Sequence, residues 1–107
     1  MIRHVVLVRF KEHTTVAQRA QFVRAFHALS TRIAQVRRLE SGVNSSPEGL
    51  DKGFTHCFLV SFDNPADRDA YLPHPAHQAF VQETSAWVAD VLVVDYQTSA
   101  HTSEEST

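Results

Sequence analysis

The amino-acid sequence predicts an α+β fold in which one antiparallel β-sheet is covered by helices on one of its faces. Three short segments are rich in β-branched and apolar residues, a fourth is weaker, and longer segments between them carry apolar residues at helical spacing. The segments follow one another as strand, helix, strand, strand, helix, strand. The 107 residues are the size of one domain.

The first strand is expected over residues 2–10, because "IRHVVLVRF" is short, apolar and β-branched. Side chains alternate along a strand, so His4 shares a face with Val6, and both faces carry apolar residues. A helix is expected over 14–36, where Thr15 and Gln18 fit a capping box. Its apolar stripe consists of Phe22, Phe26, Leu29, Ile33 and Val36.

The middle of the chain predicts a strand, a loop and a second strong strand. The weak strand, 39–46, is expected at an edge of the sheet, and Pro and Gly mark a loop over 45–53. The segment 54–62, "FTHCFLVSF", is the strong strand. Its face that is expected to meet the helices carries His56, Phe58, Val60 and Phe62.

Two helices and a final strand are expected after it. The first helix begins after Asn64, because the proline that follows suits the first helical position, and it ends near Tyr71 before Pro73. A second helix is expected over 76–90, and the last strand over 91–98.

This order of elements is that of a ferredoxin-like βαββαβ fold, with the helices on one face of the sheet. Residues 1–98 are expected to form the domain, and the polar tail 99–107 is expected to be flexible. The other sheet face is also apolar, with Val5, Leu7, Cys57 and Leu59. An uncovered apolar face is a contact surface, so we expect a homodimer through the sheet faces, a homodimeric α/β barrel.

Composition restricts the partners and the compartment. Apolar residues make up 43% of the chain, charged residues 21%, and the net charge is −2, which argues against nucleic acid or an anionic membrane surface as partner. The apolar runs are too short to span a bilayer, and the N-terminus lacks the pattern of a signal peptide. The single cysteine, Cys57, suits a reducing compartment, so a cytoplasmic location is expected.

Candidate chemistry centres on the segment "YLPHPAHQAF", residues 71–80. Its two prolines fix the backbone between two helices and thereby aim Tyr71 and His77. His77 is the candidate general base for a proton next to a carbonyl, and Tyr71 is a candidate donor to the developing enolate oxygen. Asp95 is the candidate residue that orients the imidazole of His77. Alternatively, His77 lies in the first turn of a helix and only bonds locally.

The remaining candidates lie on the inner sheet face. His4, His56, Phe58 and Val6 are expected to line a pocket between sheet and helices that takes a small-molecule ligand. Antiparallel pairing would place the two histidines well apart, which argues against a metal pair. The H-x-x-H of "HPAH" lacks further ligands nearby, and haem-binding motifs are not evident. No metal or other cofactor is therefore expected.

Four segments in this order, "HVVLVRF", "KGFTHCFLVSF", "YLPHPAHQAF" and "VLVVDY", resemble the stress-responsive dimeric α/β-barrel (Dabb) family over residues 2–97. The resemblance implies a ferredoxin-like fold dimerised through its sheets. Most members carry no established activity. A plant branch consists of polyketide cyclases, which close a linear poly-β-keto thioester by aldol condensation. The tyrosine and histidine that they use match Tyr71 and His77 here, and further histidines match His4 and His56.

Three functions stay open at this point. The chain is a Dabb-type dimer of unassigned activity that binds a small molecule, a cyclase-like lyase or isomerase with His77 as base, or a dimeric scaffold without activity. A roomy pocket beside His77 would favour the first two, because a scaffold needs none. Fold alone does not decide among them.

Overall fold

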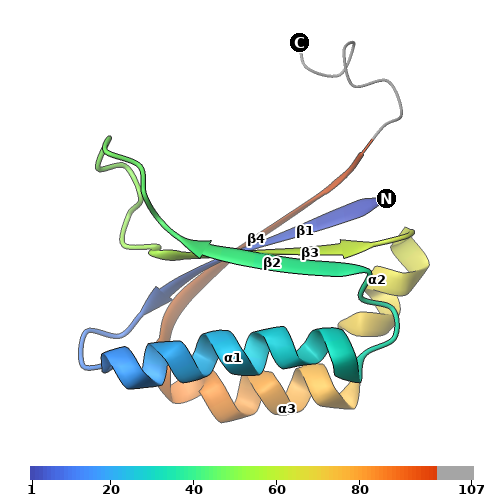
Figure 1. Ribbon diagram of the computed structural model, residues 1–107, viewed down its shortest axis with the longest axis horizontal. Helices are drawn as coiled ribbons and strands as arrows, with labels where there is room; N and C mark the ends of the chain where they lie inside the picture. The colour runs from blue at the N-terminus through green and yellow to red at the C-terminus, as the bar shows by residue number, and fades with distance from the viewer. Residues whose placement is uncertain (99–107) are drawn as a thin grey trace.

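The computed structural model describes residues 1–98, and the predicted tail 99–107 lies outside them. One four-stranded antiparallel sheet, in the order β2-β3-β1-β4, has its helices on one face (Figure 1), which confirms the ferredoxin-like fold. The elements are β1 Ile2–Phe10, α1 Val16–Arg32, β2 Arg38–Val43, β3 His56–Phe62, α2 Pro65–Tyr71, α3 Pro75–Thr84 and β4 Val88–Gln97, with a 3-10 turn Ser85–Trp87 before β4.

The register of the sheet decides which side chains share the inner face, towards the helices. The central strand β1 pairs with β3 on one side and β4 on the other. His4 lies opposite Val60 and Asp95, and Val6 lies opposite Phe58 and Val93. Because paired residues point to the same face, Asp95 joins His4 on the inner face. The weak strand β2 forms the edge, as predicted.

The core lies between this face and α1. All five residues of the predicted α1 stripe are buried, and the ring of Phe26 stacks on that of Phe58 at 4.2 Å between centroids. The predicted capping box is present at Thr15 and Gln18. The helix ends at Arg32, earlier than predicted, so the last two stripe residues pack from the following loop.

The prediction of helix over 76–90 is wrong at its C-terminal end. Helix α3 ends at Thr84, and β4 already begins at Val88. Val88 pairs with Phe10 across the ladder, and the amide of Lys11 donates to the carbonyl of Trp87 at 2.9 Å. Pairing with β1 thus satisfies the backbone groups that a longer helix would have satisfied internally.

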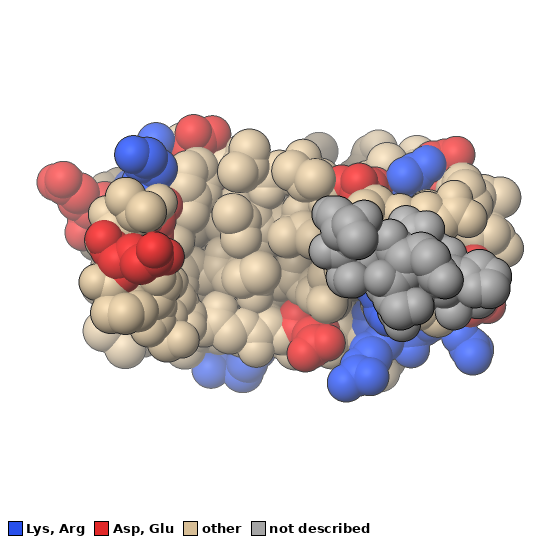
Figure 2. Space-filling view, turned by 90° about the horizontal axis from the view of Figure 1, so that it is seen from above, with Lys and Arg blue, Asp and Glu red and all other residues tan. Residues whose placement is uncertain are grey.

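Among residues 1–98, no helix covers the opposite face of the sheet, whose centre is apolar. We call it the outer apolar face: Val5, Leu7, Cys57, Leu59, Leu92, Val94 and Tyr96. The β4 members Leu92, Val94 and Tyr96 are each about half exposed. Viewed from this side, an uncharged band crosses the middle of the molecule and charged residues gather towards its ends (Figure 2). Within residues 1–98, no helix is long and apolar enough to cross a membrane.

Candidate functional site

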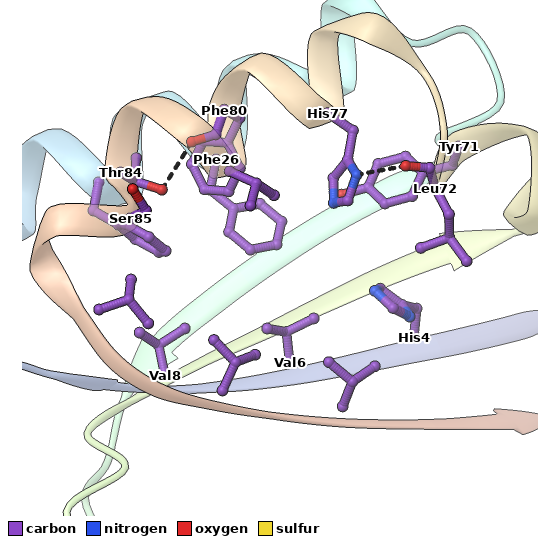
Figure 3. Close-up of a pocket in the computed structure, with 15 residues that line it drawn as sticks. His4, Val6, Val8, Phe26, Tyr71, Leu72, His77, Phe80, Thr84 and Ser85 are labelled. Atoms are coloured by element: carbon purple, nitrogen blue, oxygen red, sulfur yellow. Dashed lines mark hydrogen bonds between the residues drawn. The ribbon is translucent and has the colours of Figure 1, made fainter.

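A cavity of about 440 Å³ lies between the inner sheet face and the helices. Its two histidines and its tyrosine gather at one end, where His4 points up from β1 and His77 points down from α3 beside Tyr71 (Figure 3). The rest of the wall is mostly apolar, with Val6, Val8, Phe22, Phe26, Phe80 and Val88 among its residues. The cavity therefore joins a small polar end to a larger apolar chamber.

The turn between α2 and α3 positions His77. The side chain of His74 caps α3 by accepting from the amide of Ala76 at 3.0 Å, and Pro75 follows at the first helical position. This brings the first turn of α3 against the end of α2, where Nδ1 of His77 donates to the carbonyl of Leu72 at 2.9 Å. In the neutral ring Nε2 is then unprotonated, so it can accept a proton.

The electrostatics of His77 favour the neutral ring. Burial is the main cause that lowers its pKa from 6.5, and a positive charge on the neighbouring imidazole of His4 or His74, when that ring is protonated, lowers it further. The hydrogen bond to Leu72 opposes this shift without reversing it. At neutral pH His77 is therefore available as a base.

Tyr71 places an unpaired hydroxyl at the same end of the cavity. Its side chain is fully buried, and within residues 1–98 the hydroxyl has no hydrogen-bond partner. The ring centroid lies 4.6 Å from that of His77 and 6.0 Å from that of His4. Burial raises the pKa of Tyr71, so the group stays a protonated donor at neutral pH. A buried hydroxyl without a partner is energetically unfavourable, which sets Tyr71 apart from the other buried polar side chains around the cavity.

Asp95 bonds to a different histidine from the one expected. Its Oδ1 accepts from Nδ1 of His4 at 2.7 Å, and its Oδ2 accepts from Arg68 at 3.0 Å. The expectation that Asp95 orients His77 is corrected: a backbone carbonyl, that of Leu72, does so. The cause is the sheet register, which pairs Asp95 with His4.

Two of the four expected pocket residues lie elsewhere. Val6 and His4 line the cavity, whereas Phe58 is fully buried beneath α1. His56 lies opposite Val8, further along the sheet, where its ring bonds Thr55 and packs edge-on against Phe10. The two histidines are thus well apart, as the strand pairing predicted. Burial and the positive charge of Arg19 lower the pKa of His56.

Sequence reasoning missed two groups at the polar end, Arg68 and the carbonyl of Leu72. Arg68 lies three residues before Tyr71 on α2, a spacing that puts both on neighbouring positions of one helix. That spacing can be seen in the sequence. The partner of Arg68, Asp95 on β4, cannot be identified without the strand order and register of the sheet. Among residues 1–98, no group of three or more His, Cys, Asp or Glu side chains is arranged to hold a metal ion.

Comparison with known proteins gives relatives that match nearly the whole chain. Olivetolic acid cyclase from Cannabis sativa is 25% identical over 95 residues, which cover 89% of this chain and 94% of that protein. The structure of At3g17210 from Arabidopsis thaliana is 27% identical, with a TM-score of 0.88 over 94% of this chain and 97% of that one.

A solved structure described as a dimeric ferredoxin-like protein of unknown function, from Thermobifida fusca, is 26% identical. Its TM-score is 0.74, and the match covers 91% of this chain and 90% of that one. The family model of the stress responsive A/B barrel domain matches residues 2–98, all but the first residue of the described part. The chain belongs to this Dabb family, as its sequence motifs indicated.

Proposed function

We propose that this protein binds a small carbonyl compound in the cavity and catalyses proton transfer next to the carbonyl, with His77 as general base. The observation that carries the proposal is the meeting of His77 and Tyr71 at one end of an apolar cavity. Among residues 1–98, one ring nitrogen of His77 has no hydrogen-bond partner, and the hydroxyl of Tyr71 is buried without one. A base and an oxyanion donor side by side are what enolate chemistry needs.

Removal of the proton needs no reactant other than His77 and the carbonyl compound. Nε2 of His77 takes the proton, the C–H electron pair forms a carbon–carbon double bond, and the carbonyl oxygen becomes an enolate oxygen. Tyr71 donates a hydrogen bond to that oxygen, and its raised pKa keeps it protonated. The enolate carbon then either regains a proton or attacks a second carbonyl.

The walls of the cavity favour a ligand with an apolar tail. Beyond the polar end, two hydroxyls line the chamber, but both donate to backbone carbonyls of α3: Thr84 to that of Phe80 at 2.8 Å, and Ser85 to that of Gln82 at 3.0 Å. The hydrogens of these two hydroxyls are therefore not available to a ligand, and the neighbouring walls of the cavity are aromatic and aliphatic. A compound with one carbonyl head and an alkyl chain fits this division.

The name of one relative supports the reaction class. Olivetolic acid cyclase is named as a cyclase, and ring closure through a carbanion begins with removal of a proton next to a carbonyl. An identity of 25% supports a proposal about the class of reaction, but it does not identify the substrate.

The test is hydrogen–deuterium exchange next to the carbonyl of 2-heptanone, followed by proton NMR in D₂O. A general base contributes about 10²–10⁴-fold to such steps, so His77→Gln should lower the protein-catalysed exchange rate by about 10²-fold or more. Tyr71→Phe should lower it because the enolate loses its donor. His13→Gln, which removes an exposed histidine before α1, is the matched control and should exchange as the wild type does. Equal rates in all four proteins would contradict the base.

A second candidate is binding without turnover. It is favoured by the orientation of His77 through a backbone carbonyl, since the carboxylate of Asp95 is bonded to His4 instead. In that case 2-heptanone should shift the amide resonances of residues that line the cavity while its exchange rate stays at the background. The scaffold without activity gains no support from a cavity of this size.

We also infer that the working unit is a homodimer through the outer apolar face. The relatives from Thermobifida fusca and Bacteroides fragilis are described as dimeric, and an exposed apolar sheet face needs a cover. The single cysteine lies exposed on this face, which fits the reducing, cytoplasmic location that composition suggests.

A further inference from the structure

Three elements are linked at the polar end of the cavity by a chain of charged hydrogen bonds. Arg68 on α2 donates to Oδ2 of Asp95 on β4 at 3.0 Å, and Oδ1 accepts from Nδ1 of His4 on β1 at 2.7 Å. Nε of Arg68 also donates to Asp69 at 3.0 Å, so the guanidinium is held on two sides. The side chains of Arg68 and Asp95 are about one quarter exposed, and that of His4 is 6% exposed.

This arrangement fixes which nitrogen of His4 carries a proton. A carboxylate oxygen only accepts, so Nδ1 of His4 must be the donor. In the neutral ring Nε2 is then an acceptor, and His4 lines the cavity. The polar end would therefore offer two imidazole acceptors, on His4 and His77, and one phenolic donor, on Tyr71.

The charge of the neighbours decides whether the ring of His4 stays neutral. The groups that face it are Asp95 from β4, Phe62 from β3, Tyr71 from α2 and His77 from α3. A carboxylate with no other partner would favour an imidazolium beside it. Arg68 shares the negative charge of Asp95 and so weakens that pull.

We propose that Arg68 is a positioning residue of the cavity, which holds Asp95 so that His4 presents an uncharged acceptor to the ligand. The benefit of an uncharged His4 for ligand recognition rests on the proposed function. The charge state of His4 itself is independent of that function, because it is measured without a ligand.

The test is long-range ¹H–¹⁵N NMR of the imidazole nitrogens at pH 7 in the wild type, Arg68→Gln and Arg68→Lys. The wild type should show His4 neutral, with the proton on Nδ1. Arg68→Gln should give the pattern of an imidazolium at His4, and a charged His4 should lower the pKa of His77 below its wild-type value. Arg68→Lys keeps a cation on Asp95 and should retain the neutral ring.

Controls separate positioning from mere packing. Arg24→Gln, which removes an exposed arginine of α1, should change neither ring. The amide resonances of Leu72 and His77 report whether α2 stays docked in Arg68→Gln. If α2 does not stay docked in Arg68→Gln, the spectrum of Arg68→Lys is the test, and an imidazolium at His4 in that variant would overturn the proposal.

Two further results would overturn it: an imidazolium at His4 in the wild type, or a neutral His4 in Arg68→Gln with α2 in place. The exchange assay with 2-heptanone is independent of these spectra. Its failure would remove the proposed function and leave the role of Arg68 in the charge of His4 standing.

Discussion

At the scale of single residues, the cavity contains two groups whose hydrogen-bonding capacity is not used within residues 1–98. Nδ1 of His77 is occupied by Leu72, while its other nitrogen is free to act as a base. The hydroxyl of Tyr71 is buried and has no partner within residues 1–98. A buried hydroxyl without a partner reduces the stability of the free protein, so its presence beside a base supports the proposal of a ligand site.

Replacing the tyrosine should separate stability from function. Tyr71→Phe removes the buried, unpaired hydroxyl and keeps the ring that packs against Phe62 at 5.0 Å between centroids. We expect the free energy of unfolding in urea to rise by about 1 kcal/mol, because an unsatisfied buried polar group costs about 1–3 kcal/mol. Exchange of 2-heptanone should fall in the same variant. A loss of stability would mean that the hydroxyl is satisfied in the free protein.

The pKa of His77 makes a prediction about acid stability. Unfolded His77 titrates near 6.5, and burial lowers the pKa in the folded state. As the pH falls through 6.5, the unfolded chain gains a proton that the folded chain resists, so the free energy of unfolding decreases until the folded pKa is passed. His77→Gln should therefore lose less stability between pH 7 and pH 5 than the wild type. His13→Gln is the reference variant. If the free energy of unfolding falls equally with pH in the wild type and in His77→Gln, the lowered pKa of His77 is contradicted.

At the scale of elements, the short helix α2 organises the polar end. It carries Tyr71 and Arg68, and the carbonyl of Leu72 just beyond it holds His77. Its own N-terminus is fixed by Asn64, whose side chain accepts from the amide of Asp67 at 2.8 Å. A seven-residue helix has little stability of its own, so these anchors decide its position.

Removing the two helix caps should therefore have unequal effects on function. Asn64→Ala and Thr15→Ala should each cost about 1 kcal/mol of stability, measured in urea, because each cap satisfies an otherwise free amide. Only Asn64→Ala should lower the exchange of 2-heptanone, since α1 is held by its buried stripe while α2 depends on its anchors. Equal losses of exchange in both variants would argue against this role of α2.

The strands, the caps and the inner face of the sheet could be predicted from the sequence because they depend on local patterns. Alternation placed His4 and Val6 on the inner face, and the capping box marked the start of α1. The partner of Asp95 could not be predicted, because it depends on the β1–β4 register, which pairs residues 91 positions apart. Helix α3 was predicted too long because local propensity does not reveal the ladder that Val88 joins.

At the scale of the whole molecule, the sheet separates two functions. Its inner face forms the floor of the cavity, and its outer apolar face is the surface through which we infer that two copies pair. β4 belongs to both: Val91 and Val93 line the cavity, while Leu92 and Val94 lie on the outer apolar face. Dimerisation would therefore support the cavity floor from behind.

A charge on the outer apolar face should break the dimer. Val94→Glu places a carboxylate at the centre of the face, beside Val5, and burying it against a second copy would be strongly unfavourable. Size-exclusion chromatography with light scattering should give a dimer for the wild type and a monomer for this variant. Val16→Glu, at an 86% exposed position at the start of α1, is the control and should remain a dimer. A monomeric wild type would contradict the inference.

The central claim, that His77 is a base in a ligand cavity, is tested most directly by titrating His77 by NMR with and without 2-heptanone. We predict a pKa below the ordinary 6.5 in the free protein and a further change when the ketone is added. The exposed His13 should titrate identically in both samples. A His77 that titrates like a free histidine and does not respond to the ketone would contradict the claim.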